Sequence, residues 1–197
     1  MNFPRSAGIL LHPTSLPGRY GIGEIGPEAH RWVAHLHGMS QRLWQVLPLG
    51  PTGYADSPYQ TLSTFAGNPM LISFEALREE GLLLEADVKK FPSFPEDRVD
   101  YGPVIAARTP VLEKAARSFA RRASAQLKAG LTKFEEENHF WLEDYALFTT
   151  LKQHYGNGPW VNWPAPLVRR EAKALEAARK EHGPGIRHAK ILQFLFF

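Results

Sequence analysis

The hydrophobic pattern predicts a strand, a helix and a second strand within the first fifty residues. A short apolar run at residues 7–11 lies between Pro4 and Pro13, and it suits a strand that is buried on both faces, as in a parallel sheet. Residues 27–38 repeat apolar side chains at helical spacing, and residues 43–47 form a second apolar run. This order is a βαβ unit, which predicts a parallel strand pair with a right-handed crossover.

The helix of this unit carries one apolar stripe. Its apolar side chains recur at i, i+3, i+4 and i+7, in the order Ala29, Trp32, Val33 and Leu36. We expect this stripe to face the sheet, and Arg31 and His35 to face outward. Pro27 stands at the first helical position, and Glu28 lies at the positive end of the helix.

Two loops, at residues 12–26 and 50–68, follow the two predicted strands. In a βαβ unit both such loops emerge at the same end of the sheet, where parallel α/β folds bind their ligands. The second loop sets polar and aromatic side chains in a frame of glycine and proline, namely Tyr54, Asp56, Ser57, Tyr59 and Gln60.

The composition of the second loop suits a sugar. A pyranose has an apolar face and a rim of hydroxyls, so it needs a flat aromatic for stacking and short polar groups for hydrogen bonds. The alternative is that these residues only cap the barrel, with Tyr54 and Tyr59 half-buried and Asp56 in an Asx turn. The loop alone leaves both interpretations open.

After about residue 70 the pattern is mainly helical. Residues 74–80 predict a short helix with Ser73 as its cap and Gly81 as its end, followed by a proline-bearing connector at 91–103. Further helices are expected at residues 103–129 with a kink or break at Thr109-Pro110, 140–154, 168–181 and 186–197.

The elements together predict an α/β fold. We expect residues 1–72 to form the first βαβ part of a (β/α)8 barrel with its substrate loop, and residues 73–185 to form a largely helical insertion. Residues 186–197 then form a helix that returns to the barrel. The chain of 197 residues is short for a complete barrel, which needs about 250.

Composition excludes several classes of function. The net charge of +3 is small and the basic side chains are spread along the helices, which argues against a nucleic-acid partner. There is no cysteine, no apolar run long enough to span a membrane and no signal peptide at the start, so we expect a cytoplasmic protein. No metal, phosphate-loop or catalytic-triad spacing is present, and no cofactor is predicted.

Four other polar or aromatic residues are better explained by structural roles. His12 ends the first strand beside Pro13, and Asn68 precedes a proline in a tight turn. Trp160 and Trp163 lie between prolines, where they could form a second sugar surface but more often fasten a loop to neighbouring helices.

Several long strings of residues identify a family. They are GILLHPTSLPG at 8–18, YGIG at 20–23, WQVLPLGPTGY at 44–54, DSPYQ at 56–60 and FAGNP at 65–69. The match continues through residues 98–101, 141–148 and 193–197. In these strings the chain resembles the amylomaltases, which are glycoside hydrolase family 77.

The resemblance implies a (β/α)8 barrel with helical insertions and a 4-alpha-glucanotransferase activity. Such an enzyme moves alpha-1,4-glucan segments between malto-oligosaccharides, amylose or starch by a retaining double displacement, which needs two carboxyl groups roughly 5 Å apart. In the family the nucleophile and the acid/base follow later barrel strands, beyond Phe197. The alternatives are a non-catalytic glucan-binding fragment and an alpha-glucan hydrolase, and the oligomeric state stays open.

The resemblance also assigns roles to residues of this chain. Tyr59 is similar to the aromatic that stacks at the subsite of the cleaved sugar, with Ser57 as a neighbouring contact and Asp56 in the same substrate loop. Tyr54 and Tyr101 match a pair that forms a secondary glucan site in some members. Family members are commonly more than twice as long, so we expect a fragment whose last apolar side chains surround their helix without being wholly buried.

Overall fold

The computed structural model describes residues 4–197, apart from the side chain of Tyr54. The chain divides into two compact units, of which the first ends at Ser124 and the second covers Ala125–Leu195. The division into residues 1–72, 73–185 and 186–197 stays a prediction about the complete protein.

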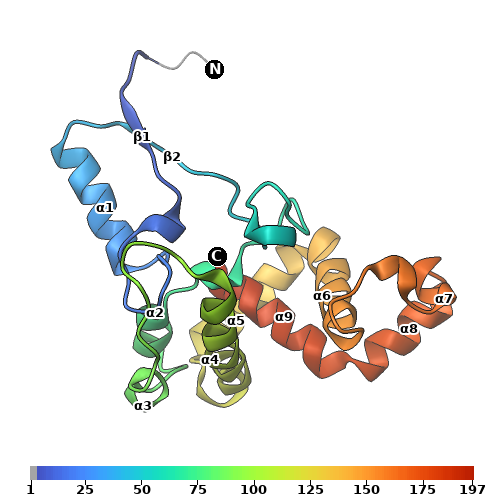
Figure 1. The fold of residues 1–197 in the computed structure, drawn as a ribbon. Helices are drawn as coiled ribbons and strands as arrows, with labels where there is room; N and C mark the ends of the chain where they lie inside the picture. Colours follow the sequence, from blue (N-terminus) through green and yellow to red (C-terminus); the bar gives the residue numbers. More distant parts are fainter. Residues whose placement is uncertain (1–3) are drawn as a thin grey trace. The chain divides into compact units, whose positions relative to one another are not determined.

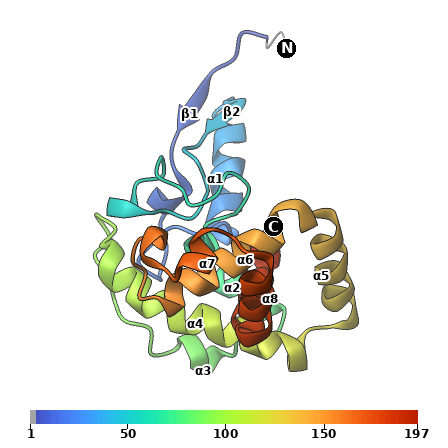
Figure 2. The same cartoon turned by 90° about the vertical axis from the view of Figure 1, so that its right-hand side faces the viewer.

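The first unit opens with the predicted βαβ arrangement. Strand β1 (Gly8–Leu10) leads through η1 (Pro13–Ser15) to helix α1 (Pro27–Gly38), and strand β2 (Leu43–Gln45) follows. The two strands pair in parallel with Gly8 opposite Leu43 and Leu10 opposite Gln45, which confirms the parallel pair. Figures 1 and 2 show α1 running beside the two strands.

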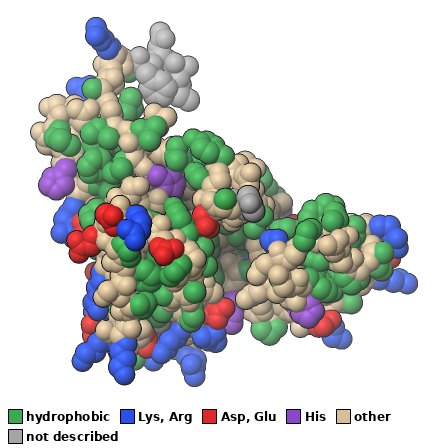
Figure 3. Space-filling view, in the orientation of Figure 1, with side chains coloured by type: hydrophobic (Ala, Val, Ile, Leu, Met, Phe, Trp, Pro, Cys, Tyr) green, Lys and Arg blue, Asp and Glu red, His purple; other side chains and the backbone are tan. Residues whose placement is uncertain are grey.

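The prediction that the first strand is buried on both faces is wrong for this structure, and the second strand is exposed as well. Leu10 is 56% exposed and Leu43 is 47% exposed. The helix stripe is also only partly covered, because Ala29 and Leu36 are buried but Val33 is 50% exposed. The described sheet has two strands of three residues each, which is too narrow to cover the whole stripe. Hydrophobic side chains are visible on this part of the molecule in Figure 3.

The core of the first unit lies beyond the sheet, around an aromatic cluster. It is built by η3 (Pro69–Leu71), α2 (Phe74–Glu79), α3 (Glu85–Val88) and α4 (Tyr101–Arg122), whereas the short turn η2 (Tyr54–Asp56) lies in the loop after β2. The ring centres of Tyr20 and Phe74 are 4.8 Å apart, and Phe91 meets Tyr20 edge-on at 5.2 Å. The predicted ends of α2 are confirmed, because the Ser73 hydroxyl accepts from the amide of Ala76 and Gly81 has a φ of 71°.

Helix α4 continues through Pro110, so of the kink or break that we expected at Thr109-Pro110, the break is absent from this described helix. Proline removes one backbone hydrogen bond, but Arg108 and Leu112 on either side of it are buried at 0% and 2% exposure. These anchors hold the helix on the core. It ends at Arg122, and Ala123 then has an extended ψ of 135°.

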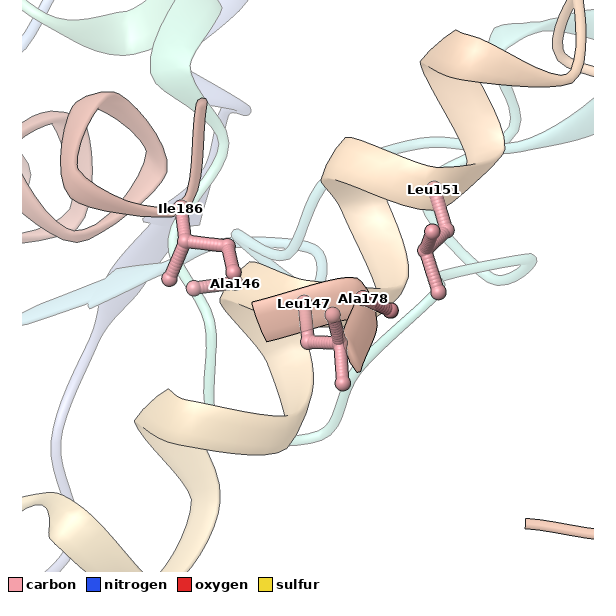
Figure 4. Close-up of a cluster of buried hydrophobic side chains, with 5 residues drawn as sticks. All are labelled: Ala146, Leu147, Leu151, Ala178 and Ile186. Atoms are coloured by element: carbon pink, nitrogen blue, oxygen red, sulfur yellow. The ribbon is translucent and has the colours of Figure 1, made fainter. Parts of the chain in front are cut away.

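The second unit is helical. Its elements are α5 (Ala125–Glu137), α6 (His139–His154), η4 (Trp160–Asn162), α7 (Ala165–Val168), α8 (Ala172–Glu181) and α9 (Gly183–Phe196). Ala146, Leu147 and Leu151 of α6 pack with Ala178 and Ile186, as Figure 4 shows. The helix predicted at residues 140–154 is therefore confirmed as α6, and its buried face is turned towards α8 and α9.

Two expectations for the second unit need correction. The helix predicted from residue 168 begins at Ala172, because residues 165–168 form the separate turn α7 and Arg170 adopts a left-handed φ of 55°. The final helix begins at Gly183, and its apolar end is better covered than expected. Ile191 is 3% exposed and Leu192, Phe194, Leu195 and Phe196 are half-buried, whereas Phe197 is 68% exposed.

Candidate functional site

The ends of β1 and β2 are tied together by side chains. The indole N–H of Trp44 in β2 donates to the carbonyl of Leu11 at 2.7 Å. The amide of Thr14 donates to His12 Nδ1 at 3.3 Å, which leaves Nε2 to donate weakly to the Pro48 carbonyl at 3.5 Å. Burial lowers the pKa of His12, although the bond to Pro48 raises it. These contacts support the structural role expected for His12.

The loop at residues 50–68 is closed by backbone bonds at its base. The amide of Asn68 donates to the Leu49 carbonyl at 2.8 Å, and the amide of Leu62 donates to the Pro51 carbonyl at 3.1 Å. Thr52 and Thr61 form an isolated antiparallel bridge. Asn68 is buried and its side chain caps η3, which supports its predicted structural role. The loop is therefore a closed unit with its base at the strand end.

The tip of this loop has an unusual backbone. Ala55 and Asp56 adopt left-handed φ angles of 57° and 53°. This backbone conformation is unfavourable for residues with a Cβ, and more so for alanine than for aspartate. Gly53 lies so close to the carbonyl of Gln60 that an added Cβ would come within 2.8 Å of its oxygen. The Ser57 hydroxyl accepts from the amide of Tyr59 at 3.4 Å, and the Asx turn considered for Asp56 stays a prediction.

The side chain of Tyr59 projects from this loop, and it is 71% exposed. Its ring is thus not half-buried in the described chain, and the capping role in a complete barrel stays an open alternative. Its backbone is held by the bond to Ser57, and the amide of Gln60 donates to the Ser57 carbonyl at 3.1 Å. An exposed ring on a closed loop is the arrangement that stacking on a sugar face requires. Asp56 and Ser57 precede it in the same turn and are half-buried.

The other aromatic candidates differ from one another. Tyr101 is the first residue of α4 and is half-buried, but the side chain of Tyr54 lies outside the described residues, so their shared site stays a prediction. In the second unit, Trp163 packs against Phe148 and Tyr155 with ring centres 5.5 and 5.6 Å away. It fastens its loop, as expected, whereas Trp160 is 48% exposed.

The first loop is compact and borders a cleft. Gly23 lies against the 3-10 turn η1, and its amide donates to the Thr14 carbonyl at 3.0 Å. Between residues 14–22 and 95–99 there is a cleft of about 650 Å³. Its lining mixes charges of both signs, including Arg19, Glu28 and Asp97.

A buried ion pair beside the first loop was missed in the sequence. Arg108 donates to Glu24 at 2.6 Å, and their side chains are 0% and 9% exposed. Burial raises the pKa of Glu24 to about 7, although Arg108 lowers it, and burial lowers the pKa of Arg108. The signal was present, because Arg108 continues the helical stripe formed by Val104, Leu112 and Ala115.

The described residues offer little for metal or membrane chemistry. Within residues 4–197 there is no group of three or more His, Cys, Asp or Glu side chains that could hold a metal ion. None of the helices seen in this range is both long and apolar enough to cross a bilayer. Basic side chains on the helices pair with acids, as Arg117 does with Glu113 and Arg170 with Asp144.

A parallel βαβ unit with a loop at its strand ends defines an α/β protein, and such folds place their ligand sites at that end of the sheet. Residues 11–197 match the family model of the 4-alpha-glucanotransferases, glycoside hydrolase family 77. The chain therefore belongs to this family.

Curated relatives agree over the whole chain. A 4-alpha-glucanotransferase of Thermus thermophilus is 48% identical over 197 residues, which is 100% of this chain and 39% of the relative. A chloroplastic/amyloplastic 4-alpha-glucanotransferase of Solanum tuberosum is 38% identical over 201 residues, which is 99% of this chain and 34% of the relative. The chain thus spans well under half the length of these relatives.

Solved structures match the described fold. The amylomaltase of Streptococcus agalactiae, in complex with acarbose, superposes with a TM-score of 0.91 at 38% identity, and the match covers 98% of this chain and 39% of that one. The amylomaltase of Corynebacterium glutamicum superposes with a TM-score of 0.69 at 17% identity over 96% of this chain and 26% of that one, which supports the fold alone.

Proposed function

We propose that the complete protein containing this chain is a 4-alpha-glucanotransferase that moves alpha-1,4-glucan segments between malto-oligosaccharides, amylose or starch. Strands β1 and β2 are then the first two strands of its (β/α)8 barrel. The family membership supports the reaction, and the lack of cysteine supports a cytoplasmic location. The complex of the Streptococcus agalactiae relative with acarbose supports a malto-oligosaccharide site.

The observation that carries the proposal is the exposed ring of Tyr59. Its loop is closed at the strand end and its side chain is 71% exposed, so one ring face can stack on a pyranose without any rearrangement of the core. Ser57 and Asp56 beside it supply a hydroxyl and a carboxylate for the sugar hydroxyls. This chain therefore provides part of the donor-side binding surface.

The catalytic carboxylates are proposed to lie in the remainder of the complete protein. A retaining double displacement needs a nucleophile and an acid/base roughly 5 Å apart. The buried carboxylate of Glu24 does not suit either role, because it is 8% exposed and bonded to Arg108. We therefore assign binding, and not bond cleavage, to this chain.

The test is the kinetics of Tyr59 variants of the complete protein with maltotriose. Tyr59→Ala should lower kcat/KM, because one sugar–aromatic contact is lost. The fall should correspond to a loss of about 1 to 3 kcal/mol of transition-state stabilisation. Tyr59→Phe is the matched control, and it should retain most activity because it keeps the ring. Thermal stability should not change in either variant, because the side chain is exposed. Unchanged kinetics of Tyr59→Ala would return Tyr59 to a structural role.

The same assay separates transfer from hydrolysis. Transfer from maltotriose produces glucose and longer maltodextrins with no gain in reducing ends, whereas hydrolysis produces new reducing ends. Water and a sugar hydroxyl compete for the same intermediate. A rise in reducing ends equal to the bonds cleaved would favour an alpha-glucan hydrolase.

A further inference from the structure

A buried ion pair joins the loop after β1 to the segment that follows the loop after β2. Glu24 lies near the end of the first loop, and Arg108 lies in α4. One guanidinium nitrogen of Arg108 donates to Glu24 Oε1 at 2.6 Å, and the other donates to the carbonyl of Ile72 at 2.7 Å. Arg108 therefore holds one group from each segment at the same time.

Further contacts fix the segment at residues 71–74. The amide of Phe74 lies 3.4 Å from both carboxylate oxygens of Glu24, and the guanidinium carbon of Arg108 lies 4.1 Å from the centre of the Phe74 ring. The amide of Ile25 donates to the Leu71 carbonyl at 2.8 Å. Backbone, carboxylate and guanidinium groups thus hold this segment together.

The held segment is directly connected to the Tyr59 loop. Residues 69–71 form η3, and its cap is Asn68, whose side chain accepts from the amide of Met70 at 3.0 Å. Asn68 also closes the loop through its bond to Leu49. Only one 3-10 turn therefore separates Ile72, which Arg108 holds, from the residue that closes the loop.

We propose that Glu24 and Arg108 are positioning residues for the glucan site, and that they act by fixing the end of the loop that presents Tyr59. This inference rests on the proposed function. A buried ion pair is often no more stable than an apolar pair of the same size, so stability alone does not explain it. Its directional bonds instead select one arrangement of the two segments.

The kinetic test uses Arg108→Met in combination with Glu24→Gln, so that no charge is left buried without a partner. In the complete protein this double variant should raise KM for maltotriose by about tenfold, because a small displacement of a binding group weakens binding strongly. Arg117→Met is the matched control. Arg117 lies on the same helix, its side chain is 52% exposed and it pairs only weakly with Glu113 at 3.3 Å, so its KM should not change.

A double-mutant cycle with Tyr59→Ala separates positioning from a general loss of folded protein. If the pair acts through the Tyr59 loop, the double variant should change KM by less than about twofold in the Tyr59→Ala background. A fall in kcat at unchanged KM, or an equal rise in KM in both backgrounds, would overturn the proposal.

Amide hydrogen exchange tests, without an activity assay, whether the Glu24–Arg108 ion pair fixes the two segments. In the double variant the amides of Ile25 and Asn68 should exchange faster, whereas the amide of Leu142 in the second unit should be unchanged. Unchanged exchange at Ile25 and Asn68 would overturn the proposal. Lack of transfer by the wild-type protein would instead contradict the proposed function, and the exchange data would still decide whether the ion pair holds the two segments.

Discussion

Gly23 lies so close to the turn η1 that adding a single methyl group, as in Gly23→Ala, should strongly lower the free energy of unfolding. A Cβ on Gly23 would lie 2.8 Å from both the amide nitrogen and the carbonyl oxygen of Leu16, and it would collide with the carbonyl of Pro13. All of these atoms belong to the backbone, so no flexible side chain can move aside. Gly23→Ala must therefore displace the turn that follows β1.

The magnitude follows from the contacts that this displacement would strain. Overpacking in a rigid site costs about 1 to 3 kcal/mol. The bonds from Gly23 to Thr14 and from Leu16 to Pro13, both 3.0 Å, contribute roughly 1 kcal/mol each if they are lost. With both bonds lost, we expect Gly23→Ala to lower the free energy of unfolding by about 3 to 5 kcal/mol.

Urea denaturation followed by far-ultraviolet circular dichroism measures this effect. The matched control is Gly38→Ala at the end of α1, where an added Cβ meets nothing within 4 Å. Because alanine favours the helix by up to about 1 kcal/mol, this control should be as stable as the wild type or more so. If Gly23→Ala and Gly38→Ala unfold at the same urea concentration, the described packing of the first loop is wrong.

Three further predictions concern titration, association and product size. Burial raises the pKa of Glu24 from 4.5 to about 7, so the folded state binds this proton more tightly than the unfolded state. Its contribution to stability should be complete below pH 4.5 and should be lost as the pH rises towards 7. Glu24→Gln should remove this part of the slope in urea titrations at several pH values. The 197-residue chain should self-associate through exposed Leu10 and Leu43, so Leu10→Lys with Leu43→Lys should shift light scattering towards the monomer, and a monomeric wild type would contradict this. In the complete protein, Tyr54→Ala should alter the sizes of the products from amylose more than the turnover of maltotriose, whereas equal losses on both would place Tyr54 in the main cleft.

Local signals predicted the backbone of the site well. The parallel pair of β1 and β2, the start of α1 at Pro27 and the Ser73 cap of α2 all follow from periodicity, proline placement and capping chemistry. Periodicity, proline placement and capping all depend on residues that are close together in the sequence. The location of the Tyr59 loop at a strand end followed from the βαβ order alone.

Contacts between distant residues explain what the sequence did not predict. Pro110 predicted a kink or break, but α4 continues through it, because the buried side chains of Arg108 and Leu112 hold the helix on its core on either side. The pairing of Glu24 with Arg108 joins residues 84 positions apart, and only the place of Arg108 on an apolar stripe hinted at it. The exposure of Tyr59 likewise depends on how the loop closes at Asn68, which periodicity does not report.

We propose that this chain supplies glucan-binding groups to a transferase whose catalytic carboxylates lie elsewhere in the complete protein. The most direct measurement is the product pattern from maltotriose, with the complete protein and the purified 197-residue chain assayed side by side. We expect glucose and longer maltodextrins from the complete protein, and no product above a heat-killed control from the chain. Transfer products from the chain alone, or none from the complete protein, would contradict it.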